Sequence, residues 1–131
     1  MNIHNEIRQE FLAAIQGKIP GISRFVNGRP VFTNLEEELP AIAVFIDETE
    51  SEELTVCDEE WHGTINIGIY LEPFMTEAGL DAVAELIRQH LSQAQLNAVS
   101  CFNLVKYSYT YDETNAAWIA ANLHYEISYQ G

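Results

Sequence analysis

The spacing of apolar residues predicts two amphipathic helices. Near the N-terminus, four apolar side chains recur at a four-residue step: Ile3, Ile7, Phe11 and Ile15. This step places them on one stripe of a helix over residues 3–16, with Asn2 as a suitable N-cap and Gly17 at its end. A second helix is predicted over residues 76–92, where Thr76 is expected to be the N-cap.

Strand patterns fill the rest of the chain. Residues 40–46 are a short β-branched run that fits a central strand. Strict alternation between residues 61 and 71 predicts a half-buried strand, whose apolar side is formed by Trp61, Gly63, Ile65, Ile67, Ile69 and Leu71.

Two β-hairpins are predicted from turn residues. Asn27-Gly28 lies between apolar residues in the stretch 24–32, and this dipeptide favours a two-residue turn. Because Pro30 has no N–H to donate, we expect this hairpin at a sheet edge. A C-terminal hairpin is predicted from two alternating runs, 104–111 and 116–129, joined at Asp112–Asn115.

The predicted order is helix, hairpin, strand, strand, helix, strand, strand. It corresponds to an α+β fold in which two helices pack on one face of a mixed, mostly antiparallel sheet of about five to six strands. No repeat or linker divides residues 1–131, so we expect one domain.

Charge narrows the possible partners. The chain has 6 basic and 20 acidic residues, a net charge of −14, which argues against binding nucleic acid or an anionic membrane. The N-terminal stretch lacks the features of a signal peptide, and no apolar run approaches the roughly 18 residues of a membrane span. We therefore expect a soluble, cytoplasmic protein.

Eight of the fourteen residues from 47 to 60, DETESEELTVCDEE, are acidic. We interpret this segment as a solvated surface loop. It also offers carboxylates to a basic partner, and parts of it are expected to become ordered in an assembly.

Little in the sequence supports a catalytic function. His62 and His124, completed by Asp58 or Glu60, would make a zinc-type set if their strands were adjacent. Ordinary histidines on a polar sheet face are the favoured interpretation, since HxH, HExxH, CxxC, GxSxG and phosphate-binding motifs are all missing from the sequence. Cys57 and Cys101 are expected to be free thiols. We predict no enzyme, no cofactor and no metal.

Aromatic residues gather in and near the last hairpin: Tyr107, Tyr109, Tyr111, Trp118, Tyr125 and Tyr129. Such residues are typical of protein interfaces, and they are equally typical of cross-strand pairs that stabilise a sheet. Both interpretations stay open at this point.

A family resemblance runs collinearly over nearly the whole chain. It is carried by NGRPVF, LPAIAVFI, the acidic segment, EWHGTINIGIYLEP and AWIAANLHYEISY in that order. These segments resemble the tail terminator proteins of long-tailed bacteriophages, the lambda-like minor tail protein U family. No single one of them is a catalytic signature.

The resemblance implies a small α+β domain with a structural role in the virion. Members of the family form a ring, typically a hexamer, on the head-proximal end of the tail tube. There they stop polymerisation of the major tail protein and present the surface for a head-tail connector or completion protein. The implied locations are the host cytoplasm during assembly and then the virion tail.

Assembly would require contact residues on the surface. The candidates are Arg29, Asp47, Glu48, Glu50, Glu52, Glu53, Tyr109 and Tyr111. The alternative function is an acidic inhibitor that mimics DNA, which fits the net charge. It fits the charge distribution less well, because most acids gather in one segment rather than along a duplex-like track.

Overall fold

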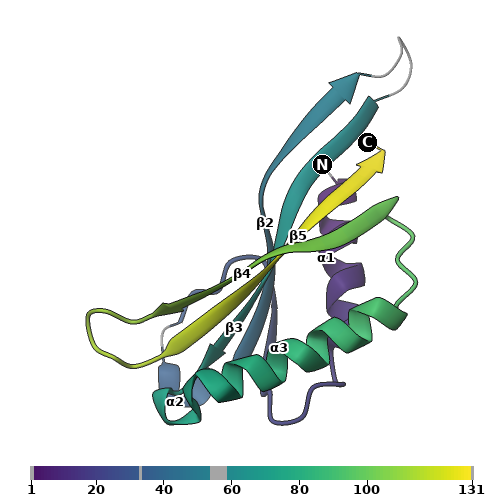
Figure 1. The fold of residues 1–131 in the computed structure, drawn as a ribbon. Helices are drawn as coiled ribbons and strands as arrows, with labels where there is room; N and C mark the ends of the chain where they lie inside the picture. The colour runs from purple at the N-terminus through teal and green to yellow at the C-terminus, as the bar shows by residue number, and fades with distance from the viewer. Residues whose placement is uncertain (1, 33, 54–58, 131) are drawn as a thin grey trace.

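The computed structural model describes residues 2–32, 34–53 and 59–130, which form one five-stranded sheet with helices on one face (Figure 1). The strand order is β1-β2-β3-β5-β4. β1 runs parallel to β2, and the other neighbours are antiparallel. The strands are β1 (Arg24–Asn27), β2 (Ala41–Glu53), β3 (Glu59–Leu71), β4 (Cys101–Tyr111) and β5 (Ile119–Gln130). The predicted α+β class is confirmed.

Both long helices occur where the sequence predicts them. They are α1 (Asn2–Ile15) and α3 (Thr76–Gln93), with two single turns, α2 (Leu35–Glu38) and η1 (Pro73–Met75), in between. Gly17 follows α1 with a φ of +76°, a value that glycine adopts easily. The predicted cap of α3 is wrong: the N-cap position is Met75, and Thr76 is the first helical residue. It follows the 3₁₀ turn of η1 directly, with a φ of +65°.

The core lies between the two long helices and one face of the sheet. Ile7 and Phe11 of α1 and Ile87 of α3 are fully buried there, together with Ile65 and Ile67 of β3. The β5 residues facing this core form the alternating set predicted from the sequence: Ile119, Ala121, Leu123, Tyr125, Ile127 and Tyr129. Helical and strand periodicities therefore converge on one apolar layer, which fixes the register of the sheet.

The predicted apolar side of β3 is confirmed, since Ile65, Ile67, Ile69 and Leu71 belong to the core, but the strand is not half-buried there, because Asn66 and Gly68 are buried too. The C-terminal hairpin is also confirmed. β4 and β5 pair from Cys101 opposite Ser128 to Tyr111 opposite Ile119. In the turn between them, the Asp112 carboxylate accepts hydrogen bonds from the backbone N–H groups of residues 114, 115 and 117. These bonds lower the pKa of Asp112, that from Ala117 most strongly.

A β-bulge interrupts β4 at Val105, because the register with β5 shifts between Leu104 and Lys106. Before the bulge, Leu104 lies on the helix side of the sheet; after it, Tyr107 does. Val105 lines a hollow on the opposite side, which we call the open face. The bulge thus changes which positions of β4 point towards α3.

The hairpin predicted around Asn27-Gly28 is wrong. Gly28 has a φ of +109°, as a turn requires, but residues 29–32 do not return as a strand. Instead β1 pairs in parallel with β2, and the Gly28 N–H donates to the Val44 carbonyl at 2.7 Å. β1 therefore pairs with β2, which is distant in sequence, and not with the residues that follow the turn. Pro30, which cannot donate a hydrogen bond to a ladder, lies where the chain leaves the sheet.

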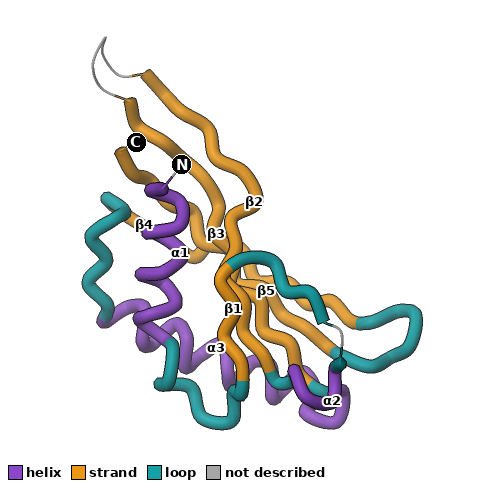
Figure 2. The backbone as a smooth tube through the Cα atoms, turned by 180° about the vertical axis from the view of Figure 1, so that it is seen from behind, coloured by secondary structure: helices purple, strands orange, loops and turns teal. Residues whose placement is uncertain are grey.

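The acidic segment is not a loop along most of its length. Residues 47–53 continue β2 and residues 59–60 begin β3, so only 54–58 lie outside the described residues. These extensions project from the body of the protein as an arm in which β2 and β3 reach beyond the end of β5 (Figures 1 and 2). We call residues 47–53 and 59–63 the acidic arm. β5 pairs with β3 as far as Glu60, and this added strand supports the arm although its charges favour solvent.

Candidate functional site

The acidic arm places like charges opposite each other. The register sets Glu52 against Glu60 and Glu53 against Glu59, and cross-strand pairs of like charge are destabilising. A bulge between Ile46 and Thr49 marks the point where the arm leaves the body. The arm therefore has a defined backbone and a concentrated negative charge. Within the part of the chain that the structure describes, residues 47–53 and 59–63 contain no basic residue except His62.

Two predicted interface residues meet at the base of this arm. Arg29 Nη2 lies 2.5 Å from Asp47 Oδ1, and the Arg29 guanidinium stacks over the Phe45 ring at 4.8 Å. The second oxygen of Asp47 accepts a hydrogen bond of 2.7 Å from Asn66 Nδ2. Arg29 and Asp47 thus hold the chain after β1 on the open face of the sheet, a role that sequence reasoning missed.

Asn66 is buried to 1% exposure, the one polar side chain so deeply buried among the described residues. It lies on the side of β3 that faces away from the helices, where the alternation predicted a polar position. Its amide group needs partners once it is removed from water, and Asp47 supplies one. The local pattern identified the side of Asn66 correctly but gave no signal for its distant acceptor.

Glu48 and Glu50 border a shallow hollow of about 220 Å³ on the open face. His62, Thr64, Val105 and Glu126 also line it. No ion pair within the described residues involves Glu48 or Glu50, so their carboxylates are available to a cation from outside. Glu52 and Glu53 belong to the same strand, although their side chains lie outside the described part of the structure.

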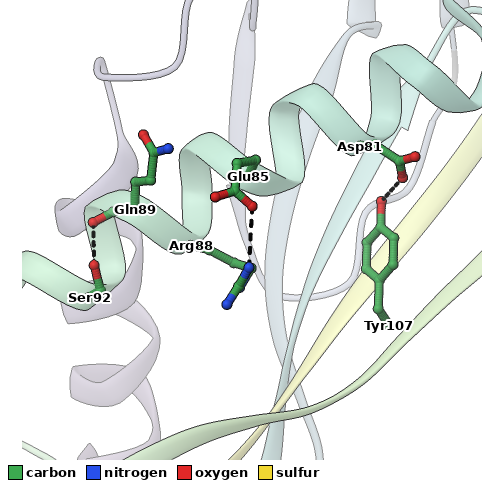
Figure 3. A network of polar contacts seen from close by, with 6 residues as sticks. All are labelled: Asp81, Glu85, Arg88, Gln89, Ser92 and Tyr107. Carbon is green, nitrogen blue, oxygen red and sulfur yellow. Dashed lines mark hydrogen bonds and ion pairs between the residues drawn. The ribbon is translucent and has the colours of Figure 1, made fainter.

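Tyr109 is engaged within the subunit. The hydroxyls of Tyr107 and Tyr109 both donate to Asp81 Oδ1 of α3, at 2.8 and 2.6 Å, and the two rings lie edge to face. Figure 3 shows the bond from Tyr107 reaching across from β4 to the helix. The hydrogen bond from Tyr109 and then that from Tyr107 lower the pKa of Asp81. Burial and the bond to Asp81 raise the pKa of Tyr107.

These tyrosines belong to a groove of about 370 Å³ between α3 and β4. Arg88 and Glu85 also line it and form an ion pair of 3.2 Å on the helix (Figure 3). Tyr107 and Tyr109 therefore fasten the outer strand of the sheet to the helix layer. Tyr111, the remaining aromatic candidate, is 64% exposed at the end of β4.

Other exposed apolar side chains lie at the end of the sheet away from the acidic arm. Phe74 and Met75 in η1, directly after β3, are 73% and 41% exposed. The arm is formed by the opposite end of the same strand. The two ends of the protein consequently differ: one is acidic, and the other exposes large apolar side chains beside the acidic Glu72 and Glu77.

The histidines do not form a metal set. The register places His62 opposite Ser128 and His124 opposite Asn66, so the two imidazoles are not cross-strand neighbours. Each imidazole lies near a serine hydroxyl, at 3.1 Å for Ser128 and 3.0 Å for Ser108. No group of three or more His, Cys, Asp or Glu in the described ranges is arranged to hold a metal ion. Asp58 and Cys57 lie outside those ranges, and Cys101 is an exposed free thiol.

Comparison with known proteins identifies the family of this chain. The model of the family described as phage minor tail protein U matches residues 2–129. The chain belongs to the phage minor tail protein U family. It is therefore a structural component of phage tails and not an enzyme.

Two tail tube terminator proteins match nearly the whole length of the chain. The chain is 28% identical over 130 residues to the tail tube terminator protein of Escherichia phage N15, covering 96% of this chain and 97% of that protein. It is also 28% identical over 131 residues to the tail tube terminator protein of Escherichia phage lambda, covering 97% and 98%.

A solved structure of a native gene transfer agent virion contains a chain with the same fold. The TM-score is 0.50 and the identity 12%, over 98% of this chain and 92% of that one. None of the helices in the described part of this tail protein is long and apolar enough to cross a membrane.

Proposed function

We propose that this protein terminates the phage tail tube. It forms a ring, a hexamer as the family resemblance implies, on the head-proximal end of the tube. There it stops addition of the major tail protein and presents the surface to which a head-tail connector or completion protein binds. The observation that carries the proposal is the nearly full-length similarity to two tail tube terminator proteins.

The asymmetry of the subunit supports this proposal. A tube grows because each added ring presents again the surface to which the next ring binds. A terminator must match that surface on one side and present a different one on the other. Here one end of β3 carries the acidic arm, and the other end leads into the exposed apolar side chains of Phe74 and Met75. No covalent chemistry is needed for such a block.

Candidate residues divide under this proposal. Glu48, Glu50, Glu52 and Glu53 on the arm and Tyr111 at the end of β4 are contact residues. Arg29, Asp47 and Tyr109 act indirectly, because their polar groups are bound within the subunit. Assembly takes place in the host cytoplasm without nucleic acid or membrane as a partner. The acidic DNA-mimic alternative finds no support in the family membership.

Electron microscopy of purified tails made with and without the protein tests the proposal. With the protein, we expect tubes of one length that carry an extra ring at the head-proximal end and join filled heads. Without it, tubes should vary in length and fail to join. Tubes of equal length and equal joining in both samples would contradict the proposed function.

A further inference from the structure

β4 forms an edge of the sheet without the protection that exposed edges usually carry. Its eleven residues, CFNLVKYSYTY, contain no proline and a single charged side chain, Lys106. Natural sheets normally block such an edge with several charges, prolines or a covering segment, because its free N–H and C=O groups pair with other strands. Apolar Val105, at the bulge, is 55% exposed. Apart from this bulge, the strand is built to be paired.

A second free edge lies on the opposite side of the sheet. β1 pairs only with the first part of β2, from Ala41 to Val44. Beyond Val44, no backbone hydrogen bond between described residues reaches β2 from the side away from β3. Residues 46–53 therefore expose a free strand edge that runs along the acidic arm.

The directions of the strands make these two edges compatible. β2, β3, β5 and β4 alternate in direction across the sheet, because each neighbouring pair is antiparallel. β4 therefore runs opposite to β2. If copies repeat by rotation about an axis roughly along the strands, β4 of one copy lies antiparallel to β2 of the next, and the alternation continues.

Charge selects this pairing over the alternatives. Lys106 makes no ion pair within the described residues, and it lies beside Val105, which lines the same hollow as Glu48 and Glu50. Two acidic arms side by side would repel, and two β4 edges would bring lysine against lysine. Only β4 against an arm joins opposite charges, which favours the correct partner and register.

We propose that copies of this protein join edge to edge, with β4 of one subunit pairing against the β2 edge of the acidic arm of the next. Lys106 faces the Glu48 and Glu50 carboxylates of the neighbour when β4 is shifted along the arm, because within one sheet Lys106 lies level with Phe45 and Cys101 lies level with Glu50. The contact uses two different surfaces of each subunit, so it is not a two-fold dimer contact, and it forms a ring when the rotation between neighbouring subunits closes. This inference rests on the proposed ring and names the surfaces that form it.

Charge reversal tests the pairing. K106E should weaken each contact about tenfold, since an attraction worth up to about 1 kcal/mol becomes a repulsion. E48K/E50K should weaken it similarly. An equal mixture of K106E with E48K/E50K should recover rings of alternating subunits, and so should the single chain K106E/E48K/E50K. K18E, which changes an exposed lysine after α1 by the same charge, is the matched control and should assemble normally.

Rings are counted on purified tail tubes by electron microscopy and in solution by sedimentation, after thermal unfolding has shown that each variant folds. If the wild-type protein fails to cap tubes, the proposed function itself is contradicted. Capping by K106E that equals wild type overturns the edge pairing alone. A mixture of K106E and wild type distinguishes this pairing from one between two β4 edges. If two β4 edges paired, K106E would strengthen association with wild type. If β4 pairs with the arm, K106E interrupts the rings.

Discussion

The Arg29 guanidinium and the Asp47 carboxylate meet at 2.5 Å and join the chain after β1 to the base of the acidic arm. The same carboxylate holds the buried amide of Asn66. Two residues that the sequence suggested for contacts between subunits thus stabilise one subunit, and the arm begins where they meet. Their substitution should change the stability of the fold before it changes assembly.

Asp47→Ala should destabilise the protein more than Arg29→Ala. Loss of the carboxylate leaves Asn66 Nδ2 buried without its acceptor, which costs about 1–3 kcal/mol in the free energy of unfolding. Loss of Arg29 removes a pair that is largely exposed, worth no more than about 1 kcal/mol. Denaturant unfolding measures both, with Arg88→Ala, from the exposed pair with Glu85, as a control. A larger loss for Arg29→Ala would contradict this account of the site.

The Asp81 carboxyl should titrate below its ordinary pKa of 3.8, because Tyr109 and Tyr107 donate hydrogen bonds to its charged form. Tyr109→Phe should move this pKa back up, and Tyr107→Phe should do so by a smaller amount. A lowered folded-state pKa stabilises the protein above pH 3.8, and this contribution disappears as pH falls through the folded value. An NMR pH titration of the Asp81 carboxyl carbon measures the shift. An unchanged pKa in Tyr109→Phe would exclude this hydrogen bond in solution.

The charges of the acidic arm should be dispensable for folding and required for assembly. Replacing Glu48, Glu50, Glu52 and Glu53 by Ser should change the free energy of unfolding by no more than about 0.5 kcal/mol, because solvated charges contribute little to the fold. Tail length control or head joining should fail instead. Thermal unfolding and microscopy of tails are the two measurements. An unfolded variant would show that the arm's charges are part of the folded structure.

Association of free subunits should be weak and should increase with salt. Six copies of a subunit with charge −14 carry six times that charge, or −84, and repulsion between them is screened beyond a Debye length of roughly 8 Å at physiological ionic strength. A single Lys106 contact per interface does not offset repulsion of that size. Sedimentation at low and high salt, with and without divalent cations, measures the effect. A ring that is most stable at the lowest ionic strength would contradict it.

Neither subunits nor rings should bind DNA at physiological salt. Of the six basic residues, Arg24, Arg29 and Arg88 are already paired with carboxylates, and the rest form no stripe. Phosphate binding requires several free cations in a row, each releasing counterions. An acidic or neutral lumen also lets a duplex pass without adhesion. A gel shift with salt-sensitive, micromolar affinity would contradict this and support a nucleic-acid function.

Local patterns predicted those parts of the fold in which one side of an element is buried. The alternation around Ile65 and Ile67 and the helical spacing of Leu80 and Ile87 were sufficient, because burial against a single apolar layer determines both. The predictions failed where a distant partner decided the outcome. Asn27-Gly28 correctly indicated a change of chain direction, but it gave no information about β2, the parallel partner of β1.

The candidate site shows the same division. The acidic segment was recognised from the sequence but was predicted to be a loop, because its composition is typical of solvated chain. Its pairing as a strand depends on β5, which is distant in sequence. Asp81 and Asn66 gave no local signal as partners of Tyr109 and Asp47. Which polar groups are used within the subunit and which remain free for assembly is set by tertiary contacts alone.

The bulge at Val105 makes the length of β4 as important as its composition. Leu104 and Tyr107 both face α3, whereas a regular strand of the same sequence would turn Lys106 and Ser108 towards the helices. Deletion of Val105 should therefore leave the faces of all other residues as they are, because Leu104, Lys106 and Tyr107 already pair with consecutive residues of β5. An insertion of one residue elsewhere in β4 that forms no bulge would act like a frameshift, since it would exchange the inner and outer faces of the rest of the strand.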